Sequence, residues 1–322
     1  MRAIKNTAKY LLGVLIRLFF YLRRSRLFWL YWLNREARIV FLRQKPQLDY
    51  VQRRILADLK RDGSALSSLD ELFPGENFLE VFKKYMNEIY PFAKPNHPTK
   101  KFLLTMWNME PLLDLNNPFV KFSLDEKILD IVNSHVGMQY KFYIMSLNET
   151  LVATGSESLA SQRWHRDPED VRVVKIFIYL NDVDENAGPF MYIMKSHFLG
   201  KWSKIFPARP PFSAYPPDGA IDKIIPKEYI KECTGKAGTV IFCETTGLHK
   251  GGFCKEKPRI MFTAGYYSSA AVTQLLLSLP KNFSDNFAEL SQVAKYALLP
   301  NHGPLATYLY KQRRKFMKKG EF

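Results

Sequence analysis

A histidine and an aspartate stand two residues apart at the start of the longest predicted strand. His165 and Asp167 lie in the stretch SQRWHRD, before the apolar run 171–180. In an extended chain, residues i and i+2 point to the same side, so the imidazole and the carboxylate face one way. A second histidine, His249, follows the apolar run 238–244. Two histidines and one carboxylate on one side of a metal favour a non-haem Fe(II) centre with open coordination positions.

Three further residues in this region could bind an organic acid. Arg259 lies ten residues after His249, at the start of another apolar run, where its guanidinium could hold a carboxylate in a bidentate pair. Thr263 falls on the same face of that strand and could add a hydroxyl contact. Lys175 is the only charge within the run 173–180. It could reach a co-substrate carboxylate, or it could extend its charge into solvent at a strand edge.

The remaining residues near the triplet have less specific interpretations. Trp164 and Arg163 directly precede the first histidine and could line the mouth of a substrate pocket. Packing for the tryptophan and a surface charge for the arginine are the alternatives. His197 is an alternative third ligand, but it is better explained as the end of a predicted hairpin. We interpret the other three histidines as structural or exposed: His97, His135 and His302.

Four sequence blocks together resemble the phytanoyl-CoA dioxygenase family: WHRD, VVKIFIYLNDVDENAGPFMYIMKSH, GTVIFCETTGLHKGG and PRIMF. The resemblance covers about residues 138–268. It implies an Fe(II)- and 2-oxoglutarate-dependent oxygenase that uses O2 and is built on a double-stranded β-helix. It also implies that His165, Asp167 and His249 are the catalytic iron ligands and that Arg259 pairs with the distal carboxylate of 2-oxoglutarate.

The same resemblance bears on the type of reaction and on two departures from the family pattern. Related halogenases replace the carboxylate ligand with a small residue, so the presence of Asp167 favours hydroxylation. Met261 stands two residues after the arginine, where many relatives of the wider superfamily have serine, and Thr263 is our substitute for that contact. Met194 and Lys195 stand where the family usually has Pro-Gly before Ser-His. A zinc hydrolase could use the same three ligands, but it would leave the arginine without a role.

The pattern of the middle of the chain predicts the elements that must position these residues. Five β-branched or aromatic runs, separated by turn sequences such as NAGP and PPDG, predict strands. They lie at 138–146, 171–180, 190–194, 238–244 and 258–267. Irregular connections between short strands favour an all-β sandwich or barrel over a βαβ fold. We therefore expect a mainly β protein with flanking helices (α+β) and a double-stranded β-helix, that is, a jelly-roll or cupin-like core.

Helical patterns flank this core and divide the chain into four segments. Apolar spacing predicts helices within 50–92, and a further helix over 120–135 with Ser123 as its N-cap. The expected segments are a basic amphipathic helical N-terminus, a mostly helical region packing on the core, the oxygenase core, and a helical C-terminal region with a basic tail. Their bounds are 1–60, 61–137, 138–270 and 271–322.

The net charge of +16 in 322 residues is concentrated at the two ends of the chain. Residues 1–60 carry 14 Lys and Arg against 3 acidic residues, and residues 301–322 carry 6 against 1. Residues 61–300 are neutral overall, which argues against a nucleic-acid-reading face. Basic ends are typical of contact with an anionic surface. Three cysteines cannot form a disulfide framework, which favours a reducing, cytoplasmic location.

The N-terminal stretch 10–34 is rich in leucine and aromatic residues but is interrupted by arginines. Its uncharged runs are far shorter than the roughly 20 residues that span a bilayer. One or two basic amphipathic helices that lie in a membrane interface, or that pack on the core or a partner, fit better. We thus expect a hydroxylase for a small-molecule or lipid-like substrate with peripheral membrane contact. The alternative is a membrane-associated β-helix binding protein with a vestigial metal site.

Overall fold

The computed structural model describes residues 2–23, 25–95, 100–107, 111–153, 160–208, 213–271, 273, 277–278 and 287–298. The interpretations of His97 and His302 lie outside these residues, as does the basic C-terminal tail.

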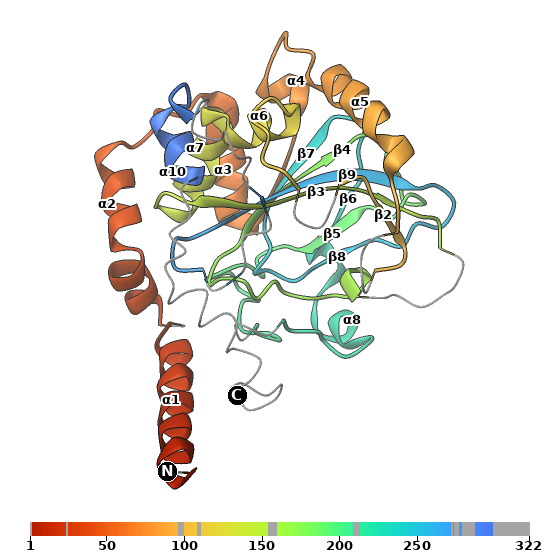
Figure 1. The fold of residues 1–322 in the computed structure, drawn as a ribbon. Helices are drawn as coiled ribbons and strands as arrows, with labels where there is room; N and C mark the ends of the chain where they lie inside the picture. The colour runs from red at the N-terminus through yellow and green to blue at the C-terminus, as the bar shows by residue number, and fades with distance from the viewer. Residues whose placement is uncertain are drawn as a thin grey trace.

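A six-stranded antiparallel sheet, with strand order β1-β7-β4-β9-β3-β2, forms the larger layer of the fold (Figure 1). All four of the predicted strands that belong to this layer are present, with boundaries shifted by a few residues. Two short strands at the sheet edges come from the predominantly helical segment before residue 138. The bounds in sheet order are Ser64–Ser68, Thr239–Glu244, Val174–Tyr179, Arg259–Tyr267, Lys141–Thr150 and Leu103–Thr105.

A smaller antiparallel sheet, with order β6-β5-β8, faces the large one. Its strands are Ile230–Cys233, Phe190–Ile193 (the fifth predicted strand) and His249–Gly251. Alternate residues of β4 and β7 point inward and meet β5 and β6 in one buried cluster, which includes Phe177, Ile241, Phe190 and Cys233. Because side chains alternate along a strand, neighbours two residues away share this inner face. The predicted co-substrate residues of β4 and β9 therefore point between the two sheets.

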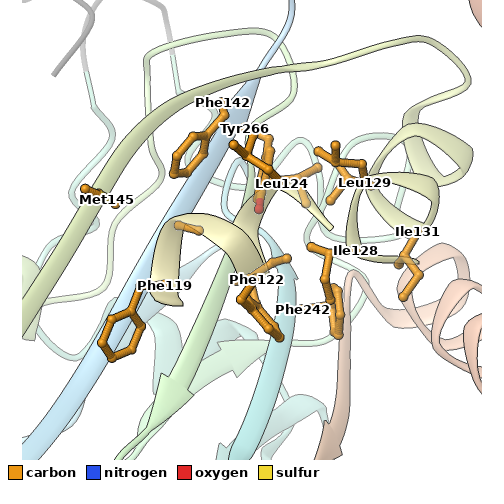
Figure 2. Close-up of a cluster of buried hydrophobic side chains, with 14 of the residues drawn as sticks. Phe119, Phe122, Leu124, Ile128, Leu129, Ile131, Phe142, Met145, Phe242 and Tyr266 are labelled. Carbon is orange, nitrogen blue, oxygen red and sulfur yellow. The ribbon is translucent and has the colours of Figure 1, made fainter. Parts of the chain in front are cut away.

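Helices cover the outer face of the large sheet (Figure 1). Figure 2 shows Phe119, Phe122 and Ile128 of two of these helices lying against Phe242 and Tyr266 of the sheet. All five side chains are fully buried, and burial of each contributes about 1.5–3 kcal/mol. The helices on this side, with their bounds, are α3 Tyr50–Asp62, α4 Leu69–Leu72, α5 Phe78–Ile89, α6 Pro118–Leu124, α7 Glu126–Val136 and α10 Gln292–Leu298. The short helix α8 (Ala220–Ile224) lies instead beside the smaller sheet (Figure 1), where Ile221 packs with Ile193 of β5. Three short 3₁₀ turns add Tyr90–Phe92, Ala160–Gln162 and Lys227–Tyr229.

The predicted helix over 120–135 is divided into two helices, which corrects the assignment of Ser123 as an N-cap. The Ser123 hydroxyl donates to the carbonyl of Phe119 at 2.7 Å, inside α6. Asp125 interrupts the helix in an extended conformation, and its carboxylate accepts a hydrogen bond from the amide of Lys127 at 2.8 Å. Asp125 is therefore the N-cap of α7, because a hydroxyl that bonds its own preceding turn cannot cap the next helix.

The N-terminal segment is helical, as predicted, and consists of α1 (Arg2–Arg23), a π-helical turn η1 (Phe28–Leu33) and α2 (Arg35–Arg43). The helix α1 projects away from the body of the molecule (Figure 1). Among the described residues, no helix is both long and apolar enough to cross a membrane.

A buried ion pair ties the end of α1 to the core. The guanidinium of Arg23 donates to the Asp170 carboxylate at 2.7 Å, and the indole of Trp29 donates to the same oxygen at 3.0 Å. The other carboxylate oxygen accepts from the amide of Ser268 at 2.8 Å. Asp170 follows Asp167 by three residues, so one short loop joins the N-terminal helices to the candidate site.

Candidate active site

Backbone pairing brings His165, Asp167 and His249 together. The amide of His165 donates to the carbonyl of His249 at 2.9 Å, and the reverse bond is 3.0 Å long. The amide of Asp167 donates to the carbonyl of Thr245, four residues before His249, at 2.9 Å. The isolated bridge and this bond hold 165–167 as an extended segment, in which residues 165 and 167 share one side, as their spacing predicts.

The three side chains converge on one point. The Nε2 atoms of His165 and His249 lie 3.8 Å and 3.6 Å from the two carboxylate oxygens of Asp167, and the imidazole centroids are 4.2 Å apart. Each side chain is nearly buried. Ligand atoms that each lie about 2.1 Å from one metal ion are at most about 4.2 Å apart. The triad thus fits a single transition-metal ion, and it is the only such group of His, Cys, Asp and Glu among the described residues.

Hydrogen bonds on the far side of each imidazole determine which nitrogen is free. The Nδ1 atom of His165 bonds the carbonyl of Arg163 at 2.8 Å, and that of His249 bonds the carbonyl of Gly247 at 3.0 Å. A carbonyl oxygen only accepts, so each Nδ1 carries the proton and each Nε2 presents a lone pair to the metal position. Burial lowers the pKa of His165, and burial together with His165 lowers the pKa of His249 to about 3. Both imidazoles are therefore neutral, as metal ligation requires.

The charge of Asp167 is balanced by a lysine. The ammonium of Lys175 lies 2.7 Å from the carboxylate of Asp167. Burial alone would raise the pKa of Asp167, but the charge of Lys175 opposes this effect and helps to hold this pKa well below its usual range. Two groups that the sequence did not indicate stand nearby. Burial and the charge of Asp167 raise the pKa of Glu169 to about 7, and burial lowers the pKa of Lys100.

Arg259 lies next to β8, and not all of the N–H groups of its guanidinium have a hydrogen-bond partner among the described atoms. It is 4% exposed. Its Nη1 donates to the carbonyl of Gly188 and its Nη2 to the hydroxyl of Thr150 at 3.3 Å, whereas its buried Nε has no hydrogen-bond partner among the described atoms. A Cβ atom built on Gly251 would lie 3.2 Å from Nη2. The guanidinium therefore packs against the strand that carries His249.

The other predicted co-substrate residues share the inner face of the large sheet. Met261 packs on the inter-sheet cluster, so Arg259 and Thr263, two positions to either side of it on β9, face the same way. Lys175 points inward for the same reason, two residues before Phe177 on β4.

The residues predicted for the pocket mouth are engaged with neighbours. Arg163 forms an ion pair of 3.2 Å with the exposed Asp218, and the ammonium of Lys250 lies 4.9 Å from the centre of the Trp164 ring. The sequence did not indicate Tyr215, whose ring stacks on the imidazole of His165 with 5.6 Å between centroids.

Arg166, between the two candidate ligands, has a structural role that the sequence did not indicate. All its hydrogen-bond donors are directed at backbone carbonyls, with bonds of 2.6–3.0 Å. The acceptors are Ser196, Trp202, Ile205, Phe206 and Thr246. The side chain is 3% exposed, and burial lowers its pKa to about 10. It joins the loop 196–206 to the segment that carries the triad.

His197 is not placed among the candidate ligands. It lies near Glu244, which neighbours the inward-facing Cys243 on β7 and so points to the opposite face. His135 is buried there too, with Nε2 2.8 Å from a carboxylate oxygen of Glu244. These two histidines belong to a separate buried cluster behind the sheet.

Comparison with known proteins relates the fold to iron-containing enzymes. No family model and no curated protein sequence matches the chain. The epimerase SnoN, solved with Fe3+, alpha ketoglutarate and nogalamycin RO, superposes with a TM-score of 0.50 at 13% identity, covering 79% of this chain and 91% of SnoN. EctD from S. alaskensis with bound Fe gives a TM-score of 0.50 at 17% identity, covering 74% of this chain and 86% of EctD. At these identities the likeness shows a shared fold.

Proposed function

We propose that the protein is an Fe(II)- and 2-oxoglutarate-dependent dioxygenase that hydroxylates a small-molecule or lipid-like substrate. The observation that carries this proposal is the convergence of two neutral histidines on one buried carboxylate, with Nε2 atoms 3.6 Å and 3.8 Å from it. The superposed enzymes support it, since both were solved with iron and SnoN also with alpha ketoglutarate.

In this proposal the residues of the triad hold the metal and leave its other positions open. His165 and His249 each ligate through Nε2, whose lone pair is directed by the carbonyl bond at Nδ1. Asp167 supplies the third ligand and stays ionised because Lys175 compensates its charge. When bound, Fe(II) with 2-oxoglutarate and O2 supplies an oxidant that can hydroxylate a C–H bond, with succinate and CO2 as the products of 2-oxoglutarate. Three protein ligands on one side are the arrangement that this chemistry uses.

We assign Arg259 to the distal carboxylate of 2-oxoglutarate. Its guanidinium is buried beside β8 and retains an unpartnered Nε–H, and a planar guanidinium recognises a carboxylate through two parallel hydrogen bonds. Thr263 shares its strand face and adds a hydroxyl to the same region. Lys175 is held by Asp167, so its contribution to co-substrate binding is electrostatic.

Two facing antiparallel sheets, with the triad at one end, support a double-stranded β-helix core of the phytanoyl-CoA dioxygenase type. In this scheme residues 138–270 form the oxygenase core, with 61–137 and 271–322 packed on it and 1–60 as the N-terminal helical segment. We place the substrate near Trp164, Arg163 and Tyr215, because Tyr215 stacks directly on the His165 ligand.

Conversion of 2-oxoglutarate to succinate, followed by NMR with Fe(II) and O2, tests the assignment. The protein should form succinate, and Asp167→Ala should abolish it, because two histidines alone hold the metal weakly. Asp182→Asn changes an exposed aspartate that pairs with Lys236 on the surface; it is the matched control and should retain full turnover. Succinate formation that survives Asp167→Ala would refute the assignment. Absence of turnover and of metal binding in the folded protein would favour a binding protein with a vestigial site.

A further inference from the structure

A cavity of about 410 Å³ lies between the N-terminal helices and the core. Arg26 and Trp29 line it from the corner between α1 and η1, Lys60 from the end of α3, and Lys195 and Lys201 from the loop after β5. Glu244 borders this region from the outer face of β7, whereas the triad lies on the inner face. The cavity is therefore separate from the candidate active site.

This cavity, which we call the basic cavity, carries an excess of positive charge. None of the described residues that line it is acidic. Two of its six cations, Arg61 and Arg172, are neutralised by ion pairs with aspartates and with Glu244. The other four form no ion pair with an acidic residue in the described part of the chain: Arg26, Lys60, Lys195 and Lys201.

Helix dipoles do not cancel this charge. The C-terminal ends of α3 and α7 lie at the cavity, and each helix end contributes roughly half a negative charge. That leaves about three uncompensated positive charges around a space large enough for a phosphate ester.

Two buried histidines also line the same space. His135 and His197 both line the basic cavity, are each 5% exposed, and have an Nδ1 atom without a hydrogen-bond partner among the described atoms. Buried polar atoms of this kind are normally paired, so a missing partner indicates a ligand or water. Because the Nε2–H of His135 is donated to the Glu244 carboxylate, its Nδ1 presents a lone pair, so the donors available to an oxyanion here are the lysines and Arg26.

Lys195, in the loop that lines the basic cavity, has a strained backbone. Its φ is 62°, a left-handed conformation that glycine adopts without cost. Non-glycine residues in such conformations cluster at functional sites, where the side chain has a role. Leu199, in the same loop, also has a positive φ and exposes 65% of its surface at the rim of the cavity.

An exposed apolar stripe lies on α1, which ends at Arg23, three residues before Arg26 of the basic cavity. Its residues follow helical spacing and are each 38–66% exposed: Tyr10, Leu11, Val14, Leu15, Leu18, Tyr21 and Leu22. In η1 and just before it, Leu27 and Trp32 are 68% and 75% exposed. Apolar stripes of this size on a soluble surface mark contact with a membrane or a partner. Aromatic and leucine side chains beside arginines are typical of helices that lie in the headgroup region of a bilayer.

We propose that the basic cavity binds the phosphate of an anionic phospholipid while the apolar stripe of α1 lies in the membrane interface. The cations match the phosphate charge, and the adjoining stripe provides the surface that acyl chains would contact. The proposal does not depend on the oxygenase assignment, because none of its residues belongs to the triad. A lipid surface is favoured over a soluble phosphate ester because α1, which carries the stripe, ends three residues before Arg26 of the cavity.

Flotation of the full-length protein with vesicles tests the proposal. Binding should be tight to phosphatidylcholine mixed with phosphatidylglycerol and weak to phosphatidylcholine alone. Each basic residue near a charged membrane strengthens binding about fivefold, so Lys195→Gln with Lys201→Gln should weaken binding to the mixed vesicles about thirtyfold. The matched control Lys84→Gln with Lys94→Gln removes two exposed lysines that line no part of the cavity. It should change binding less than threefold, and equal losses in both pairs would overturn the cavity assignment.

Two further variants distinguish the effect of the Lys195 charge on binding from an effect on folding, and from the effect of apolar contact. Lys195→Gly removes the charge and relieves the left-handed strain, so it should bind less well without losing thermal stability. Leu11→Gln with Leu15→Gln should weaken binding to both kinds of vesicle, because it removes apolar contact and leaves the cavity intact.

The source of the phosphate is settled by soluble glycerol phosphate as a probe. If glycerol phosphate raises the melting temperature while the vesicles bind equally with and without phosphatidylglycerol, the cavity takes a soluble ester and the membrane proposal is wrong. A dimer in light scattering that dissociates in the Leu11/Leu15 variant and binds no vesicles would assign the stripe to a second copy of the chain and would likewise overturn the proposal.

Discussion

Asp170 joins the N-terminal helices to the loop that carries Asp167, and Asp170→Asn tests that connection. The carboxylate of Asp170 accepts hydrogen bonds from Arg23, Trp29, Val171 and Ser268 at 2.7–3.0 Å. Arg23 and Asp170 are each 1% exposed. The substitution preserves the size of the side chain but leaves the guanidinium as a buried charge without an anionic partner.

The expected loss of stability can be worked out from this burial. Breaking a buried ion pair by removing one partner costs about 3–5 kcal/mol. The entropy of unfolding, at about 2.1 cal/mol/K per residue, is about 0.7 kcal/mol/K for a chain of 322 residues. The melting temperature should therefore fall by about 4–7 °C. The double variant Arg23→Met with Asp170→Asn removes both charges, so it should recover a large part of that loss.

Thermal unfolding followed by circular dichroism measures the effect. Asp182→Asn is the matched control, because Asp182 and its partner Lys236 form an exposed pair; its melting temperature should equal that of the unchanged protein within error. A melting temperature for Asp170→Asn within a degree of the unchanged protein would show that breaking the buried Arg23–Asp170 pair does not carry the expected cost. A double variant less stable than the sum of the two single variants would also contradict it.

Three further predictions concern the site and its surroundings. Arg166→Met should lower the free energy of unfolding by at least about 5 kcal/mol in chemical denaturation, because it leaves several buried carbonyls without donors; a change below 1 kcal/mol (about the net value of one hydrogen bond) would be inconsistent with that role. Arg259→Ala should raise the KM for 2-oxoglutarate at least about thirtyfold, by loss of a charge-assisted hydrogen bond of about 2 kcal/mol, with partial recovery in Arg259→Lys; an unchanged KM would remove Arg259 from the co-substrate site. Burial, together with Glu126 and Asp125, raises the pKa of Asp130 to about 6. The native state therefore favours the protonated carboxyl, and the resulting contribution to the free energy of unfolding is fully present below about pH 4. It is lost as the pH rises through 6, so Asp130→Asn should raise the melting temperature at pH 7.5 more than at pH 4, and the opposite order would show that Asp130 is not desolvated.

The strands that carry the site could be predicted because they are long enough to show a pattern. The runs that became β4 and β7 are apolar and β-branched, and turn sequences flank them. The spacing of His165 and Asp167 also predicted their common orientation, since it depends only on the geometry of an extended chain. By contrast, β2 and β8 have three residues each, which is too short for any periodicity to be recognised.

The site residues that the sequence pattern did not indicate make their contacts with partners that are distant in sequence. Asp170 binds Arg23, 147 residues away, and Arg166 binds the carbonyls of a loop that begins 30 residues later. Tyr215 contacts His165 only because the loop 213–215 folds back over the triad, where Ala214 pairs with Arg166. Tertiary structure creates such contacts, and a local pattern of residue types carries no signal for them. The error at Ser123 is of the same kind, because a serine hydroxyl can bond either its own preceding turn or the next helix.

The most direct test of the proposed iron site is an anaerobic titration of the metal-free protein with Fe(II) and then 2-oxoglutarate, followed by visible absorption. We expect a weak metal-to-ligand charge-transfer band that appears on addition of 2-oxoglutarate, is lost in His165→Ala and is weakened in Arg259→Ala. The absence of a band in protein that circular dichroism shows to be folded, or a band of unchanged strength in His165→Ala, would contradict the assignment of His165, Asp167 and His249 as the iron site.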